Sequence, residues 1–211
     1  MKTSKIIIIG ISLFIGIISC KKDTPKNDYC IRRIVTNPDT CIISEENLNT
    51  IKTLFESNHL DYSKYQFFKF VTDDFGGHHA GCYQFIHDLK VFSNTLIFHF
   101  NQAGNYYSLS GDIIEDIPLN AIPSMNQKYV VDKFLIELSK DHLYAGSKEE
   151  ISHGCFDVEF GYYDLNAGAG LVEKKFTKAW RVKPKNNKCP VAYINDMTSG
   201  VIYYDNGIRY K

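Results

Sequence analysis

The sequence lacks the short motifs by which several classes of protein are recognised. It contains no HExxH, no GxSxG, no phosphate-cradling glycine loop and no set of kinase motifs, so the common hydrolase and nucleotide-dependent classes have no support. No cysteines follow a CxxC or CxxxC spacing, so nothing indicates a zinc knuckle. No positive field exists to attract nucleic acid, because 24 lysines and arginines face 24 aspartates and glutamates.

A long apolar run is also missing. The run that is present reaches from Ile6 to Ile18 behind Lys2 and Lys5. Its thirteen residues would span only about 20 Å as a helix, at roughly 1.5 Å each, whereas the hydrocarbon core of a bilayer is roughly 30 Å thick. The pattern therefore disfavours a transmembrane anchor and favours an export signal.

The end of this run, Ile17-Ile18-Ser19-Cys20, resembles a bacterial lipobox. The resemblance implies cleavage after residue 19 and acyl chains, palmitate among them, on Cys20; the alternative is a plain signal peptide with a chance cysteine. The polar stretch KKDTPKNDY that follows is typical of a flexible tether. We expect a signal peptide at residues 1–19, a lipidated tether at 20–43, and an exported protein held at the cell membrane or outer membrane of a bacterium. Removing residues 1–19 leaves 22 basic against 24 acidic residues.

The chain has few cysteines, and an odd number of them remains once Cys20 is assigned to the lipid. The five remaining are Cys30, Cys41, Cys82, Cys155 and Cys189. In a compartment that permits disulfides, at least one of them must stay free or pair between molecules. One arrangement pairs Cys30 with Cys41 and Cys155 with Cys189 and leaves Cys82, but the sequence alone does not fix the connectivity.

Apolar periodicity divides the remaining chain into two similar halves. SEENLNTIKTLFESNHL, from Ser44, has helical spacing behind a serine N-cap, and strand-like spacing follows in YQFFKFV, CYQFIH, VFSNTLIFHF and NYYSLSG. After the linker DIPLNAIPSMN, a second helix is expected in QKYVVDKFLIELSKDHLYAG, with Gly146 as its stop, and strands follow in CFDVEFGYYDL, KKFTKAWRVKP, PVAYINDMTSG and VIYYDNG. The pattern predicts an α+β fold of two successive units, residues 44–117 and 118–211, each a helix packed on an antiparallel β-sheet.

The stretch FGGHHAGCYQFIHDLKVF, residues 75–92, gathers the candidate metal ligands His78, His79, Cys82 and His87. In an extended strand, residues 79 and 87 would lie about 26 Å apart at roughly 3.3 Å per residue, too far for one ion, and two ligands alone make a weak site. A thiol nucleophile at Cys82 would need a base and an orienting partner that the sequence does not indicate. We therefore expect a buried strand cysteine, no catalytic residue, no metal and no cofactor.

Taken as a whole, residues 73–112 resemble the fungalysin/thermolysin propeptide motif of the prodomains of secreted thermolysin-type metallopeptidases. The family pattern leads from an acidic residue and a glycine through two strands, each with a histidine, to a third strand that closes on glycine. The matching positions are Asp74, Gly76 or Gly77, His79, Gln84, Val91, His99, Gly104 and Gly111. The chain departs from the pattern at Gly81, where the family usually has arginine, and at Asp88, where it usually has a turn glycine.

The C-terminal half is similar to the PepSY domain that follows in the same prodomains. AWRVKP resembles its strand with a central tryptophan, here Trp180, and AYINDMTSGVIY resembles its final hairpin. Thr198 matches this hairpin, whereas Asn195 replaces the usual aspartate.

In that family the peptidase follows the prodomain, whereas this chain stops at Lys211, so the resemblance implies a prodomain without its enzyme. It implies a non-enzymatic, membrane-anchored protein that binds or inhibits a secreted thermolysin-type metallopeptidase, since family prodomains occlude the cleft of their enzyme. The candidate contacts are tyrosines of two strands and of the terminal segment 201–210, unless they are ordinary edge-strand aromatics. They are Tyr106, Tyr107, Tyr203, Tyr204 and Tyr210.

Two other classes of function stay open. One is a cell-envelope lipoprotein that uses the same fold as a scaffold for a glycan, a peptide or another envelope protein. The other is a small enzyme built around Cys82 or the histidines, which fast alkylation of Cys82 near neutral pH would favour.

Overall fold

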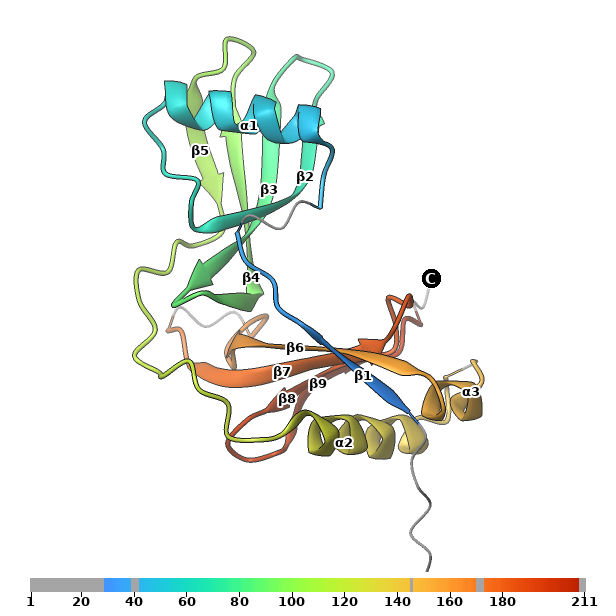
Figure 1. The fold of residues 1–211 in the computed structure, drawn as a ribbon. Helices are drawn as coiled ribbons and strands as arrows, with labels where there is room; N and C mark the ends of the chain where they lie inside the picture. Colours follow the sequence, from blue (N-terminus) through green and yellow to red (C-terminus); the bar gives the residue numbers. More distant parts are fainter. Residues whose placement is uncertain (1–28, 39–41, 145, 170–172, 209–211) are drawn as a thin grey trace, which may run out of the picture.

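The computed structural model describes residues 29–38, 42–144, 146–169 and 173–208, which form a mainly β protein with helices at its surface (Figure 1). The described strands are β1 (Cys30–Ile34), β2 (Tyr65–Thr72), β3 (His78–Ile86), β4 (Leu89–Phe100), β5 (Tyr106–Ser110), β6 (Cys155–Asp164), β7 (Phe176–Pro184), β8 (Val191–Asn195) and β9 (Val201–Asp205). The described helices are α1 (Glu45–Ser57), α2 (Gln127–Lys140) and α3 (Lys148–Ser152). None of these helices has the length and apolar character needed to cross a bilayer.

All nine described strands belong to one hydrogen-bonded sheet. Its order is β2-β3-β4-β6-β7-β8-β9, with β5 paired to β4 and β1 paired to β6 beside this path. The β4–β6 and β1–β6 pairs are parallel, and the others are antiparallel. The mixture of helices and a sheet is confirmed, but two separate units are not, because β4 carries the sheet from one half into the other. Periodicity shows which face of a strand is buried and does not show which strand lies beside it.

Helix α1 covers one face of β2, β3 and β4, as the sequence predicts. Ser44 is its N-cap, and the Ser44 side chain accepts a hydrogen bond from the backbone N–H of Asn47 at 3.3 Å. Phe55 lies at the centre of this contact, and its ring centroid is 4.7 Å from that of Phe98 and 5.3 Å from that of Phe67. The first apolar core is therefore an aromatic cluster between one helix and three strands.

Helix α2 covers β6, β7 and β8 in the same way. Its buried residues are Val130, Val131, Phe134 and Leu138, all of which helical spacing predicts. The helix ends at Lys140 with Asp141 as C-cap, however, so the predicted stop at Gly146 is wrong. The Asp141 carboxylate explains the earlier end, because it accepts hydrogen bonds from the backbone N–H groups that follow it.

The two halves of the sheet meet where β4 and β6 run parallel, at Lys90 opposite Gly161. A side chain at Gly161 would collide with the Lys90 carbonyl. The Lys90 side chain is buried; its ammonium donates a hydrogen bond to Gln66 at 3.0 Å and lies 3.6 Å from the centroid of the Tyr83 ring. Burial lowers the pKa of Lys90 to about 8, because the charged form loses hydration.

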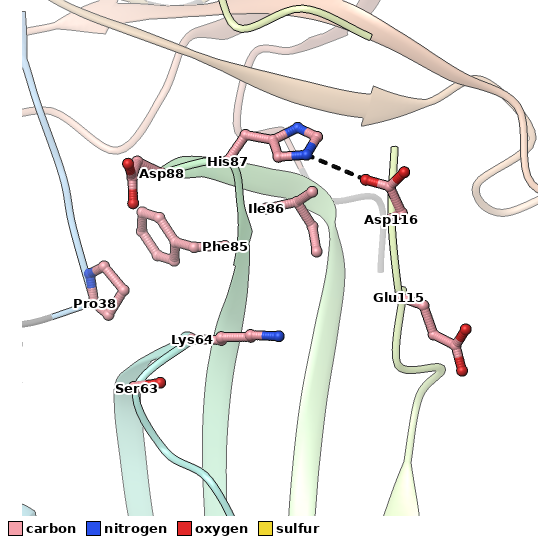
Figure 2. A pocket seen from close by; sticks show the side chains of 9 residues that line it. All are labelled: Pro38, Ser63, Lys64, Phe85, Ile86, His87, Asp88, Glu115 and Asp116. Atoms are coloured by element: carbon pink, nitrogen blue, oxygen red, sulfur yellow. Dashed lines mark ion pairs between the residues drawn. The ribbon is translucent and has the colours of Figure 1, made fainter. Parts of the chain in front are cut away.

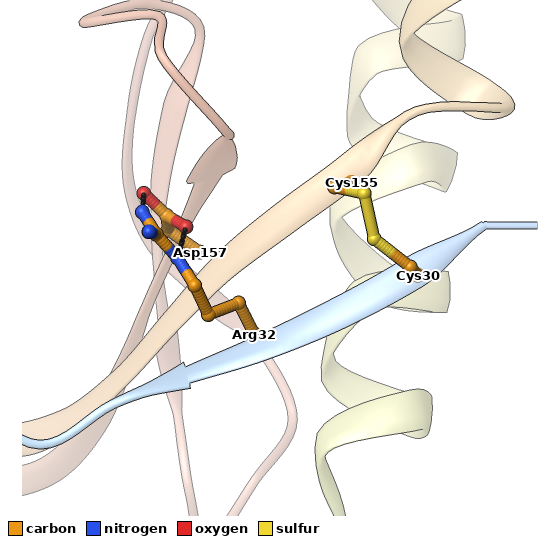
Figure 3. The surroundings of a disulfide bond; sticks show 4 residues. All are labelled: Cys30, Arg32, Cys155 and Asp157. Carbon is orange, nitrogen blue, oxygen red and sulfur yellow. Dashed lines mark hydrogen bonds and ion pairs between the residues drawn. A yellow bond between two sulfur atoms is a disulfide. The ribbon is translucent and has the colours of Figure 1, made fainter.

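Strand β1 lies within the segment expected to be tether, and it runs parallel to β6 instead. A disulfide joins Cys30 to Cys155 at the start of this pair, and Arg32 donates hydrogen bonds of 2.7 and 2.8 Å to Asp157 (Figure 3). The arrangement that pairs Cys30 with Cys41 and Cys155 with Cys189, one of those left open by the sequence, is therefore excluded. A parallel register joins cysteines 125 positions apart in sequence, which their spacing cannot reveal. Cys41 lies outside the described residues.

Candidate functional site

The most distinctive polar arrangement lies on the face of β3 and β4 away from α1. His79 and His99 are directly opposite each other, and their Nδ1 atoms are 2.7 Å apart. The other ring nitrogen of His79 lies 2.9 Å from Asp73 Oδ2, and that of His99 lies 2.8 Å from Ser110 Oγ. We call these four residues the histidine network.

The network has one consistent direction of hydrogen bonding when both imidazoles are neutral. An ionised Asp73 can only accept, so the proton of His79 lies on Nε2 and its Nδ1 is an acceptor. His99 must then donate from Nδ1, which leaves its Nε2 to accept the hydroxyl proton of Ser110. One proton therefore lies between the two rings, and a second would set two donors against each other at 2.7 Å.

The surroundings favour this neutral state of His99. Partial burial lowers the pKa of His99, and the neighbouring His79 lowers it further. The hydrogen bond with His79 holds the pKa of Asp73 below its usual range, and the backbone N–H groups of Gly77 and Phe75 add to this effect. Asp73 thus fixes both the imidazole and the turn between β2 and β3.

A groove adjoins the network. It has a volume of about 270 Å³, and Gly81 is one of its lining residues. The others are Phe68, Lys69, Val71, His79, Ile97 and His99. Ser110 is not one of these residues, so its hydroxyl does not line the groove. The hydrogen bonds that Asp73 and Ser110 make with the two imidazoles therefore serve to orient the rings. The groove itself can accept an apolar side chain.

A second pocket, also of about 270 Å³, lies at the other end of β3 (Figure 2). It contains the β3–β4 turn residues His87 and Asp88 together with Glu115 and Asp116. His87 Nε2 lies 3.2 Å from Asp116 Oδ1, so the imidazole closes one side of the pocket. Its lining is mixed, with the apolar side chains of Phe85 and Ile86 beside the carboxylates of Asp88, Glu115 and Asp116, whereas no acidic residue lines the groove beside His79.

The histidines considered as candidate metal ligands are not brought together. His79 faces Asp73 and His99, whereas His87 faces Asp116 at the far end of β3. Within the described ranges, no group of three or more histidine, cysteine or acidic side chains is arranged to hold an ion. Cys82 is fully buried, and burial raises the pKa of its thiol. The thiolate that a nucleophile requires is therefore disfavoured.

The two candidate tyrosines of β5 point to opposite faces. The Tyr106 ring lies near Phe98 and Phe100, on the side that α1 covers. The Tyr107 side chain is 60% exposed and lies 6.0 Å from the His99 ring, on the open face. Because neighbouring strand residues alternate, a partner on the open face can meet only Tyr107.

The tyrosines of β9 divide in the same way. The Tyr204 hydroxyl donates to Asp141 beside α2, whereas Tyr203 lies next to Tyr193 on the other face. Tyr107 and Tyr203 thus lie on the faces that α1 and α2 do not cover, and their role as contacts stays a prediction. Tyr210 lies outside the described residues.

The remaining family-pattern positions hold the fold together. The Gln84 amide is buried and both accepts from and donates to the backbone of Ile114, which fixes the chain beyond β5 to β3. The Trp180 indole N–H donates to Asp196 at 2.8 Å. Cys20, the predicted lipid attachment site, lies outside the described residues.

Sequence reasoning did not identify Asp73 or Ser110 as partners of the histidines. Strand alternation could have placed His79 and His99 on one face, but pairing them required the register of β3 on β4. The sequence does not single out Asp73, because the family pattern matches its neighbour Asp74, which is exposed. Only the fold of the turn places the Asp73 carboxylate beside His79.

Residues 69–113 match the family model of the Fungalysin/Thermolysin Propeptide Motif. The matched segment runs from the middle of β2 to just beyond β5 and contains the whole histidine network. A comparison with curated proteins found no match. This part of the chain is therefore similar to a thermolysin-type propeptide, which points to a prodomain-like role rather than a catalytic one and to association with a peptidase of that type.

Proposed function

We propose that this protein is a non-enzymatic, prodomain-like binding protein that recognises a thermolysin-type metallopeptidase and restrains its activity. The observation that carries the proposal is the propeptide match over residues 69–113, the segment that holds both the histidine network and most of the groove. Its open face supports contact with a partner, because the imidazoles are held in place before binding and little ordering is needed.

Two further features of this segment suit it to recognition. Strand β2 is at one end of the sheet order, so its outer edge can pair with an extended partner segment. The Tyr107 side chain stands exposed beside the network and can act as an aromatic anchor.

The other parts of the proposal rest on the sequence. We propose that Cys20 is acylated, so that the protein is anchored at a bacterial cell membrane or outer membrane, and that residues 118–211 form a PepSY-like unit. Packing of α2 on β6, β7 and β8 supports such a unit. Mass spectrometry of the mature N-terminal peptide tests the lipid: a diacylglyceryl mass on Cys20 is expected, and an unmodified cysteine contradicts the anchor.

Inhibition kinetics test the peptidase-binding proposal. A soluble chain from residue 21 onward, which contains every described element, is mixed with a thermolysin-type peptidase that is hydrolysing a fluorogenic peptide. We expect a dose-dependent loss of rate at micromolar concentrations, with the chain itself uncut on a gel and a serine peptidase unaffected. An unchanged rate with about 100 µM chain, against that enzyme and the peptidases of the host, contradicts the proposal.

A second candidate function has its own observation. The pocket between the β3–β4 turn and residues 115–116 combines apolar side chains with three carboxylates, which suits a small ligand that carries hydroxyl or amine groups, and residues on both sides of the matched segment help to line it (Figure 2). A cell-envelope lipoprotein that uses the fold as a scaffold for a glycan, peptide or protein ligand would use this pocket. Loss of glycan or peptide binding in Asp116→Ala, with peptidase inhibition absent in the unchanged chain, would favour this alternative.

A further inference from the structure

The β2–β3 hairpin exposes a large aromatic side chain at its tip. Phe75 is 88% exposed, although the turn that carries it is well fixed. Asp73 accepts hydrogen bonds of 2.8 Å from the backbone N–H groups of Phe75 and Gly77, and the N–H of Gly76 bonds to the Asp73 carbonyl at 3.0 Å. The apolar ring is thus held out in water by a well-fixed turn, so it is available to a partner without further ordering of the backbone.

The stem of the same hairpin carries an apolar hollow. The groove beside the histidine network is present partly because residue 81 has no side chain. A Cβ there would come within 3.3 Å of the Phe68 ring and 3.4 Å of the Lys69 Cβ, and it would reduce the groove. Phe68, Val71 and Ile97 make the lining suitable for an aromatic ring.

Charge distinguishes the tip from the stem. Asp74 is exposed next to Phe75, and Lys69 is exposed at the groove. Within the described ranges, neither side chain takes part in an ion pair. The tip is therefore apolar and anionic, and the groove is apolar and cationic, so each complements the other in both respects.

We propose that the occupant of the groove is Phe75 of a second copy of this chain, so that two copies form a reciprocal dimer through their β2–β3 hairpins. Tip and groove are about six residues apart along the strand, roughly 20 Å at 3.3 Å per residue. Two hairpins laid antiparallel and face to face bring each tip over the groove of the other, and each Asp74 then meets a Lys69. Because both contacts are made at once, the interface is isologous and closes at two copies.

Sedimentation equilibrium of the chain from residue 21 onward tests this proposal without any peptidase, so its outcome is independent of the proposed function. Between about 5 and 500 µM, in low salt, we expect the mass to rise from that of one copy to that of two. Phe75→Ala and Gly81→Leu should each weaken dimerisation at least tenfold. Ile122→Ala, which removes another exposed apolar side chain outside the hairpin, should leave it unchanged.

The charges permit a sharper test. Asp74→Lys and Lys69→Asp should each weaken the dimer, because each sets like charges together, whereas the double variant should recover to within about threefold of the original. Asp74 and Lys69 are exposed, so these variants keep the fold, which circular dichroism verifies. A single-copy mass at every concentration, a dimer that survives Phe75→Ala and Gly81→Leu, or no recovery in the double variant overturns the proposal. Loss of peptidase inhibition in Phe75→Ala of a purely monomeric chain would assign the tip to the peptidase instead.

Discussion

At the scale of single residues, the histidine network shows how a fixed surface is built on an open sheet. His79 and His99 are held from outside by Asp73 and Ser110 and share one proton between them. Each ring therefore has one orientation and one tautomer, which presents a defined surface to a partner. The same arrangement makes the surface sensitive to acid, because a second proton places two N–H donors in contact.

The first prediction concerns the pH dependence of stability. Since the pKa of His99 is lowered in the folded state, the unfolded chain binds this proton more readily, and the free energy of unfolding should fall as the pH drops below about 6.5. His99→Gln should make this part of the profile flatter. Urea unfolding at several pH values measures it, and His142→Gln, which changes an exposed histidine, is the control. Equal slopes for His99→Gln and the unchanged chain would contradict the network.

A pair of phenylalanines tests the difference between core and surface. Phe55 is fully buried among aromatic rings, so Phe55→Ala should lower the free energy of unfolding by about 3–5 kcal/mol. Phe75 is exposed, so Phe75→Ala should change it by less than about 0.5 kcal/mol. Both are measured by denaturant unfolding at low micromolar concentration. A large loss for Phe75→Ala would mean that its ring packs within its own chain.

At the scale of elements, β4 is the member that joins the two halves. Its end near Phe100 pairs with β3 and β5, and its start near Lys90 pairs with β3 and runs parallel to β6. Burial of a lysine at this junction carries a cost, since its ammonium is removed from water and bonded to an uncharged amide.

The burial of Lys90 should make the stability of the protein depend on pH in the alkaline range. Because the pKa of Lys90 is about 8 when folded and near 10.4 when unfolded, stability should rise between these values as the folded state loses its proton first. The gain should be about 3 kcal/mol at most, because each unit of difference between the two pKa values corresponds to about 1.4 kcal/mol. Lys90→Met should remove this rise and be no less stable at pH 7. Thermal unfolding from pH 7 to 10 measures both; a rise that persists in Lys90→Met would come from other groups.

At the scale of the whole molecule, β1 and its disulfide connect the start of the described chain to the second half of the sheet. The bond joins residues 125 positions apart, so it restricts the unfolded chain strongly. Replacing both cysteines, Cys30→Ser with Cys155→Ser, should lower the free energy of unfolding by about 2–5 kcal/mol. Chemical denaturation measures this loss. Addition of a reductant should cause the same loss in the unchanged chain and none in the double variant.

The sequence predicted what depends on local pattern and missed what depends on register. Ser44 and the apolar face of α2 follow from spacing along one helix, and both were predicted. The Cys30–Cys155 bond and the parallel pairing of β4 with β6 join distant segments, and no local pattern encodes them. The candidate site was predicted in part from the sequence and depends in part on strand register. Family resemblance identified His79 and His99, but only the fold shows that they touch.

Binding of a peptidase through residues 69–113 is tested most directly by hydrogen exchange of the chain, alone and with a thermolysin-type peptidase inactivated by removal of its zinc. Mass spectrometry then reports which backbone N–H groups become protected. We predict slower exchange in residues 69–113, above all in β2, β3 and the turn between them, with the β6–β9 half changing less. Unchanged exchange throughout, or protection confined to residues outside 69–113, would contradict it.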